Sequence, residues 1–214
     1  AKPNDPSWPT PWGDGRPGWH LECSAMAHAY LGAEFDIHGG GLDLVFPHHE
    51  NEIAQSEAAG YGFAQLWMHN AWVTTSGEKM SKSLGNSLQV MEVLKRVRGI
   101  ELRWYLGSAH YRSMLEFSFE ALDESATAFR RIENFLTRAR EATGALAEPV
   151  IAPEFAAVMN DDLSVPQGLA LISEWLRAGN SALTSNNKAE ISKFAAYIRG
   201  ALNILGCDPY DPAY

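Results

Sequence analysis

Residues 66–86 read LWMHNAWVTTSGEKMSKSLGN, and this stretch decides the class of the fold. Its first part, Leu66–Thr74, has the aromatic and β-branched content of a buried strand. Ser76 and Gly77 then mark a turn, and Gly85 marks a second break in the chain. Because helical patterns follow the second break, the stretch predicts a strand, a polar loop and a helix in succession, which is typical of an α/β domain.

The loop between the strand and the helix has the composition of a phosphate-binding segment. Lys79 and Lys82 lie three residues apart, and Ser81 lies between them. Ammonium groups can neutralise the charge that develops on a transferring phosphate, and small hydroxyl residues allow a close approach. An ordinary exposed turn is the alternative for any segment that has two lysines at this spacing.

Upstream of this stretch the chain predicts further helices and strands after an irregular start. Residues 1–18 are rich in proline and glycine. The expected elements are a helix over Trp19–Leu31 ended by Gly32, a strand over Phe35–His38 that runs into Gly39–Gly41, and a helix from Pro47 to about Ala59 closed by Gly60.

Downstream the patterns are helical throughout. Phe119–Thr143 is one long amphipathic pattern. The other helices are expected over Leu88–Val97, Ile100–Ala109, Phe155–Met159, Val165–Ala178 and Ala189–Leu205. The sequence therefore predicts an α/β domain over residues 1–115 and an all-α helical bundle over residues 116–214, with the boundary near Arg112–Phe117.

Composition and charge limit the kinds of partner. The chain of 214 residues has a formal net charge of −9, distributed as −8 over residues 1–78, +5 over residues 79–112 and −6 over residues 113–214. An acidic chain is a poor general binder of nucleic acid, because phosphate neutralisation dominates that affinity. The basic segment fits contact with one phosphate-bearing ligand, and a solvated helix surface is the alternative.

The sequence carries no sign of export or of a membrane. No apolar run reaches the roughly 18 residues of a membrane span, and the first residues lack the basic start and apolar centre of a signal peptide. The two cysteines, Cys23 and Cys207, do not make a disulfide framework. A reducing, cytoplasmic setting is therefore expected, without a membrane partner.

A possible metal site is formed by residues of two predicted helices. Cys23 lies in the first helix, and His48 and Glu52 share one face of the second because they are four residues apart. A thiolate, an imidazole and a carboxylate are all good zinc ligands. By spacing alone, a buried thiol and a capping or surface pair of histidines remain the alternative.

Several runs of residues, in order along most of the chain, resemble the cysteinyl-tRNA synthetase family of class I aminoacyl-tRNA synthetases. Lys79–Ser83 spells the class I signature loop, and Leu84–Asn86 extends it. The other matching runs are Gly15–Met26, Phe35–Gly41, Phe46–Gln55, Gly107–Arg112 and Met159–Leu163. The resemblance implies the second half of a Rossmann-like catalytic domain, followed by the helical domain of the family that binds tRNA.

The resemblance also implies roles for single residues. Cys23, His48 and Glu52 match three of the four zinc ligands of the family, and Trp19 and His38 match residues that line the pocket for the substrate cysteine. Judged alone, Trp19 would be a core aromatic residue, and His38 would be a strand-end histidine that the backbone satisfies. His49 and Glu50 match without an assigned role, and orientation of the ligands is a reasonable one. The loop residues that match the ATP site are Lys79, Ser81 and Lys82, with Lys82 in the catalytic role.

The implied activity is that of a cysteine--tRNA ligase. Such an enzyme activates L-cysteine with ATP and Mg²⁺ to cysteinyl-adenylate and transfers the cysteine to tRNA(Cys). One Zn²⁺ ion per chain would select the substrate thiol, because zinc prefers thiolate to hydroxyl and an apolar pocket separates such small groups poorly. By analogy, the protein is expected to be a cytoplasmic monomer.

Two other functions are compatible with the same residues. The first is a paralogous ligase that joins cysteine to an amino-sugar in mycothiol synthesis, although Asn51–Gln55 and Asp161–Asp162 favour the tRNA enzyme. The second, for the fragment alone, is a non-catalytic module that binds zinc or tRNA.

The chain also departs from the pattern of the family. The fourth ligand, a cysteine near the start of the full-length enzyme, and the early signature with two histidines are not in this sequence. The chain is therefore expected to be an internal fragment that is inactive by itself, lacking also the C-terminal end. Cys207 lies far along the helical part and is expected to be a free buried thiol rather than the missing ligand.

Overall fold

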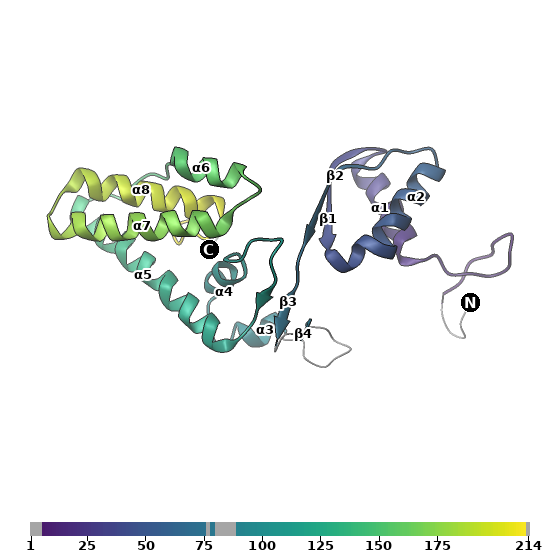
Figure 1. Cartoon of the computed structure of the whole chain (residues 1–214), viewed down its shortest axis with the longest axis horizontal. Helices are drawn as coiled ribbons and strands as arrows, with labels where there is room; N and C mark the ends of the chain where they lie inside the picture. The colour runs from purple at the N-terminus through teal and green to yellow at the C-terminus, as the bar shows by residue number, and fades with distance from the viewer. Residues whose placement is uncertain (1–5, 76–77, 80–88, 213–214) are drawn as a thin grey trace. The chain divides into compact units, whose positions relative to one another are not determined.

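The computed structural model describes residues 6–75, 78–79 and 89–212, and it forms two compact units (Figure 1). The first unit is Ala1–Ala71 and the second is Trp72–Tyr214. The prediction of an α/β part followed by a helical part is confirmed, since parallel strands occur in the first unit and long helices dominate the end of the second. The predicted domain boundary near residue 115 is a different division and remains a prediction.

The first unit is built around a parallel pair of strands. Helix α1 (Trp19–Leu31) contains no glycine or proline and ends at Gly32, whose φ of 94° lies in the left-handed region. Strand β1 (Phe35–Gly41) pairs in parallel with β2 (Ala64–Asn70), with His38 opposite Trp67. Such a pairing requires a crossover connection, which here contains the single turns η1 (Leu42–Leu44) and η2 (Val45–His49) and the helix α2 (Glu50–Ala58).

One sequence prediction at the end of this unit is wrong in detail. The expected buried strand over Leu66–Thr74 is two strands, β2 and β3 (Val73–Thr75), and Leu66 is 65 % exposed. Within the described residues β2 pairs only with β1, and all of its residues are exposed or half-buried, so the strand lacks the cover on both faces that buries a parallel strand. The extended backbone of Phe46 (φ −132°, ψ 132°) breaks the helical path directly before Pro47, as a helix start at this proline requires, and the regular helix α2 begins at Glu50.

The second unit begins with a small mixed sheet. In the described residues, β3 pairs antiparallel with β4 (Glu78–Lys79) and in parallel with β5 (Leu115–Glu116). The short helices α3 (Val90–Val93) and α4 (Gly99–Leu106) lie between β4 and β5. The sheet thus joins segments that are about forty residues apart in the sequence, on either side of the predicted phosphate loop.

A bundle of helices completes the second unit (Figure 1). Helix α5 (Phe119–Thr143) packs on α7 (Val165–Thr184) and α8 (Lys188–Ile204), and α6 (Pro153–Asn160) packs on α7. The long amphipathic pattern of the sequence is therefore confirmed as α5. Its start is capped by the Ser118 side chain, which accepts a hydrogen bond from the Ala121 amide. The fully buried side chains of the bundle core include Phe129, Phe135, Phe155, Ile172, Ile191, Ile198 and Leu202.

One buried ion pair lies within this bundle. The guanidinium of Arg199 on α8 donates hydrogen bonds to the Asp208 carboxylate, at 2.7 Å from Nη2 to Oδ2, and to the Ala147 carbonyl. Arg199 thus links two segments to α8: the chain that follows it, through Asp208, and the segment between α5 and α6, through Ala147. Among the described residues, no helix combines the length and the apolar character that crossing a membrane requires.

Candidate metal centre

The candidate site lies in the first unit, where α1, β1 and the start of α2 come together. Cys23 comes from α1, His38 comes from β1, and His48 and Glu52 come from η2 and α2. The Ser24 hydroxyl of α1 lies between the carbonyls of His20, at 3.0 Å, and of Glu52 on α2, at 3.3 Å, so the two helices are in close contact here. The three ligands predicted from the sequence therefore meet in one place.

Their ligand atoms are close enough to share one ion. The sulfur of Cys23, an imidazole nitrogen of His48 and a carboxylate oxygen of Glu52 all lie within 4.8 Å of one another. A second group, formed by His38, His49 and the same Glu52, meets the same limit. Glu52 thus lies between two sets of donors, and only the first set contains a thiol.

Glu52 is the most unusual residue of the site. Its side chain is fully buried, with Oε1 2.5 Å from His48 Nε2 and Oε2 2.8 Å from His38 Nε2. Neither contact has the geometry of a hydrogen bond, so both oxygens, and Nδ1 of His48, lack a hydrogen-bond partner among the described residues. A buried carboxylate that accepts no hydrogen bond is costly, and a coordinated cation removes that cost. The donor set therefore fits a metal ion.

The protonation of these groups depends on whether a cation is bound. Burial raises the pKa of Glu52 to about 7. Burial, followed by the charges of Glu52 and Glu22, raises the pKa of the Cys23 thiol. Burial also lowers the pKa values of His38 and His48. The imidazoles thus favour their neutral, metal-binding form, whereas the thiol and carboxylate favour protonation until a cation neutralises them.

The predicted substrate residues lie next to this donor set. The Trp19 ring is tilted against the His48 ring, with 4.3 Å between centroids, and Trp19 is 60 % exposed. Trp19 is therefore not a core aromatic residue in this unit. His38 lies in the middle of β1, with its ring against Trp67 and its Nε2 facing Glu52, so it is not a strand-end histidine that the backbone satisfies.

The structure adds His69 to the site, which the sequence analysis did not single out. Its Nε2 lies 2.8 Å from Nδ1 of His49, and burial lowers the pKa of His49 to about 4. Parallel pairing places His69 opposite Gly40. A β-carbon at Gly40 would lie 2.9 Å from the His49 ring, so the glycine allows this close approach. No sequence spacing signals this contact, since only the strand register creates it.

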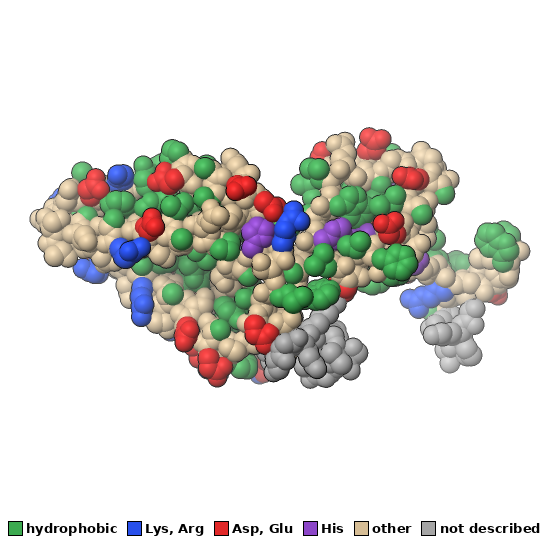
Figure 2. Space-filling view, in the orientation of Figure 1, with side chains coloured by type: hydrophobic (Ala, Val, Ile, Leu, Met, Phe, Trp, Pro, Cys, Tyr) green, Lys and Arg blue, Asp and Glu red, His purple; other side chains and the backbone are tan. Residues whose placement is uncertain are grey.

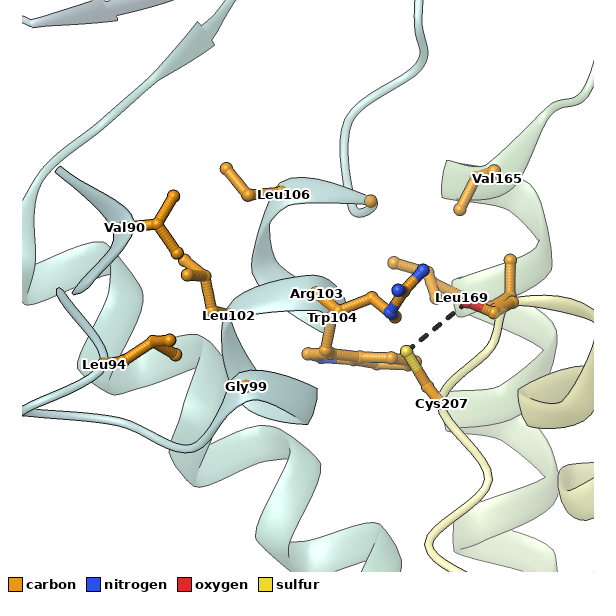
Figure 3. A pocket seen from close by; sticks show the side chains of 12 residues that line it. Val90, Leu94, Gly99, Leu102, Arg103, Trp104, Leu106, Val165, Leu169 and Cys207 are labelled. Atoms are coloured by element: carbon orange, nitrogen blue, oxygen red, sulfur yellow. Dashed lines mark hydrogen bonds between the residues drawn. The ribbon is translucent and has the colours of Figure 1, made fainter. Parts of the chain in front are cut away.

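The remaining predicted residues are Lys79, Ser81, Lys82 and Cys207. Ser81 and Lys82 lie outside the described residues, and Lys79 is described through its backbone in β4. Cys207 is a free thiol, 1 % exposed, and it belongs to neither group of candidate metal ligands among the described residues. It lies instead beside Trp104 and Leu169 at an apolar pocket of about 560 Å³ (Figure 3). The expectation of a buried free thiol is confirmed.

Comparisons with known proteins agree with the fold and the order of motifs. A family model described as the catalytic domain of class I (C) tRNA synthetases matches residues 1–127, and one described as a DALR domain matches residues 154–207. The chain is 60 % identical over 216 residues to a cysteine--tRNA ligase of Streptomyces avermitilis, covering all of this chain and 46 % of that protein. It is 59 % identical to one of Nocardioides sp., covering 100 % of this chain and 45 % of that protein.

Solved structures support the fold. A leucyl enzyme, titled as the ternary complex of Agrobacterium radiobacter K84 agnB2 LeuRS-tRNA-LeuAMS, aligns with a TM-score of 0.65 at 14 % identity, covering 94 % of this chain and 32 % of that one. Mycobacterium tuberculosis methionyl-tRNA synthetase aligns with a TM-score of 0.53 at 17 % identity, covering 81 % of this chain and 40 % of that one.

The chain spans about half the length of the curated relatives that it matches. The catalytic-domain model alone accounts for 127 of its 214 residues, and the DALR model follows in the helical part. The chain belongs to the class I (C) tRNA synthetase family.

Proposed function

We propose that the protein carrying this chain is a cysteine--tRNA ligase. It would activate L-cysteine with ATP and Mg²⁺ to cysteinyl-adenylate and pyrophosphate, and then transfer the cysteine to tRNA(Cys). The observation that carries the proposal is the meeting of Cys23, His48 and Glu52 around a buried carboxylate without hydrogen-bond partners. The 60 % identity to proteins named cysteine--tRNA ligase supports it along the whole chain.

Cys23, His48 and Glu52 would hold one zinc ion. Bound there, zinc would coordinate the substrate as a thiolate, which the hydroxyl of serine cannot imitate. Trp19 and His38 border the donor set and would line the cysteine pocket. His49, held by His69, would pack behind His38 and keep its ring oriented.

The phosphate chemistry would belong to the loop that begins at β4. Lys79, Ser81 and Lys82 would contact ATP, and Lys82 would stabilise the negative charge of the adenylation step without a covalent role. The domain division that we propose, residues 1–115 and 116–214, assigns this loop to the catalytic part. The helical part would bind tRNA, and the enzyme would act as a cytoplasmic monomer.

A groove between α5 and α7 supports contact with tRNA. It is about 590 Å³ in volume, and its charged lining side chains are all basic: Arg131, Arg138 and Arg177. Elsewhere on the visible face of the helical part, acidic and basic side chains are interspersed (Figure 2). A local cationic groove on an acidic chain is suited to phosphate groups, because guanidinium groups bind them with directed hydrogen bonds.

The test separates zinc-based selection from ATP binding. In the full-length protein, Cys23→Ser should weaken cysteine binding by at least about tenfold while the affinity for ATP stays within about twofold. Equal losses for both ligands would count against selection by zinc. Cysteine-dependent exchange of pyrophosphate into ATP would separate an enzyme from a non-catalytic module, and charging of tRNA(Cys) would identify the acceptor.

A further inference from the structure

Two of the sequence motifs without an assigned role meet in the second unit. One is the turn after α4, which contains His110, Tyr111 and Arg112, and the other is Asp162, between α6 and α7. The Tyr111 hydroxyl donates to Asp162 Oδ1 at 2.6 Å, and Arg112 donates through Nε to Oδ2 at 2.8 Å and through Nη2 to Oδ1 at 3.2 Å. The His110 ring lies 2.9 Å from the Asp162 carbonyl oxygen. Three consecutive residues therefore contact one residue fifty positions away.

The backbone at Asp162 has an uncommon conformation. Its φ is 52°, and that of Leu163 is 53°, so two consecutive non-glycine residues are left-handed. This conformation costs free energy for residues other than glycine, and it persists where the surrounding structure holds it. The hydrogen bonds between Asp162 and the His110–Arg112 turn can hold this conformation. Hydrogen bonds from Arg112 and then Tyr111 keep the pKa of Asp162 at about 2, so the carboxylate is ionised throughout the neutral range.

The turn leads directly into the small sheet. The Leu115 amide donates to the Trp72 carbonyl at 3.0 Å, and the Phe117 amide donates to the Thr74 carbonyl at 2.7 Å. On its other side, Thr74 pairs with Lys79 of β4. A short path of backbone pairing thus runs from the turn through β5 and β3 to the first lysine of the predicted ATP loop.

We propose that Asp162 is a positioning residue that couples the helical part to ATP activation. By holding the His110–Arg112 turn, it sets the place of β5 and β3, and through them the backbone of Lys79. The proposal rests on the proposed function, since Lys79 matters only if its loop serves ATP.

The contacts are too exposed to serve mainly as a source of stability. The Arg112 and Asp162 side chains are 63 % and 48 % exposed, and ion pairs of that kind contribute little to folding. Their effect on the placement of a reacting group can be much larger than their effect on folding, because a displacement of about 1 Å in such a group can lower a rate by about a hundredfold. Loss of Asp162 should therefore affect activation by ATP more than unfolding.

The neighbouring residue offers a matched control. Asp161 is exposed and carries the same charge, and its side chain forms no hydrogen bond or ion pair with another described residue. Asp162→Asn and Asp161→Asn therefore make the same change of charge one position apart, but only the first weakens the bonds to Tyr111 and Arg112.

The first measurement is hydrogen exchange of backbone amides in this chain. Asp162→Asn should speed exchange at Leu115 and Phe117 by about tenfold, while the core amides of α8 keep the wild-type rate. Asp161→Asn should match the wild type at every one of these positions. Equal exchange at Leu115 and Phe117 in the two variants would overturn the proposal.

The second measurement is cysteine-dependent pyrophosphate exchange by the full-length protein. Asp162→Asn should lower kcat/KM for ATP by roughly ten- to a hundredfold, with KM for cysteine within about twofold of the wild type. Faster amide exchange with unchanged ATP kinetics would overturn the proposal, because the turn would then order the strands without positioning the loop. A wild-type protein without pyrophosphate exchange would instead refute the proposed function, and the amide exchange alone would then decide whether Asp162 orders β5 and β3.

Discussion

Oε1 of Glu52 lies 2.5 Å from Nε2 of His48, one helical turn away, and both side chains are buried. Because the contact lacks hydrogen-bond geometry, it fits two groups that share a cation better than a donor and an acceptor. This relationship, with Cys23 beside it, is the basis of the zinc assignment.

Zinc content tests that assignment directly. The full-length protein should bind about one zinc ion per chain, and Cys23→Ser or Glu52→Gln should lower metal affinity by at least about tenfold, since each removes a ligand charge. Metal analysis after dialysis against a chelator measures the effect. Cys207→Ser is the matched control, because that thiol lies beside the apolar pocket and should leave the zinc content unchanged. Zinc retained equally in all variants would contradict the assignment.

Lys82→Ala should impair adenylation. We expect a fall of about a hundred- to a thousandfold in the rate of pyrophosphate exchange, with a much smaller change in cysteine affinity, because Lys82 is assigned to charge that develops during the reaction. Lys95→Ala provides the control, since the Lys95 amine is exposed and pairs with Glu92 on the surface of the same unit. If both variants lost activity to a similar extent, the catalytic role of Lys82 would be wrong.

Glu101 should make the stability of the second unit depend on acid pH. Its side chain is fully buried, and it accepts hydrogen bonds from Arg98 at 2.9 Å and from Arg130 at 2.6 Å. Although burial opposes the charge, the bonds from Arg130 and Arg98 lower the pKa of Glu101 to about 2. The folded pKa is below its ordinary value, so this stabilisation is present above about pH 4.5 and is lost as the pH falls toward 2.

Urea unfolding at several pH values measures this effect. Between about pH 5 and 2, the free energy of unfolding of Glu101→Gln should fall less steeply than that of the wild type. Glu124→Gln, exposed on α5, should follow the wild-type slope. Parallel slopes for Glu101→Gln and the wild type would show that Glu101 does not carry this dependence.

Gly200→Ala should destabilise the bundle. A β-carbon at this position of α8 would lie 2.1 Å from the Val150 carbonyl oxygen, and that segment is tied to α8 by the bond from the Val150 amide to the Ala196 carbonyl. Backbone must therefore move, at a cost of about 1–3 kcal/mol or more in the free energy of unfolding. Chemical denaturation measures it. Gly99→Ala is the control, because its nearest neighbour, a Leu94 methyl group, is 3.9 Å away, and an equal loss there would contradict the explanation.

The sequence by itself determined the order of elements and the identity of the chemical groups. Local patterns were sufficient for α1 and α5, where an uninterrupted helical run ends at a glycine, and the spacing of His48 and Glu52 put both on one face. The signature loop Lys79–Ser83 and the other matching runs indicated the family, because they depend on residue identity rather than on packing.

The tertiary structure decided what depends on contacts between distant segments. Strand register brought His69 to His49, and the turn between α6 and α7 brought Asp162 to Tyr111 and Arg112. The same cause explains the failed prediction of one buried strand over Leu66–Thr74, since burial is set by which neighbours cover a strand. Composition and periodicity act over a few residues, whereas these pairings are set by the path of the whole chain.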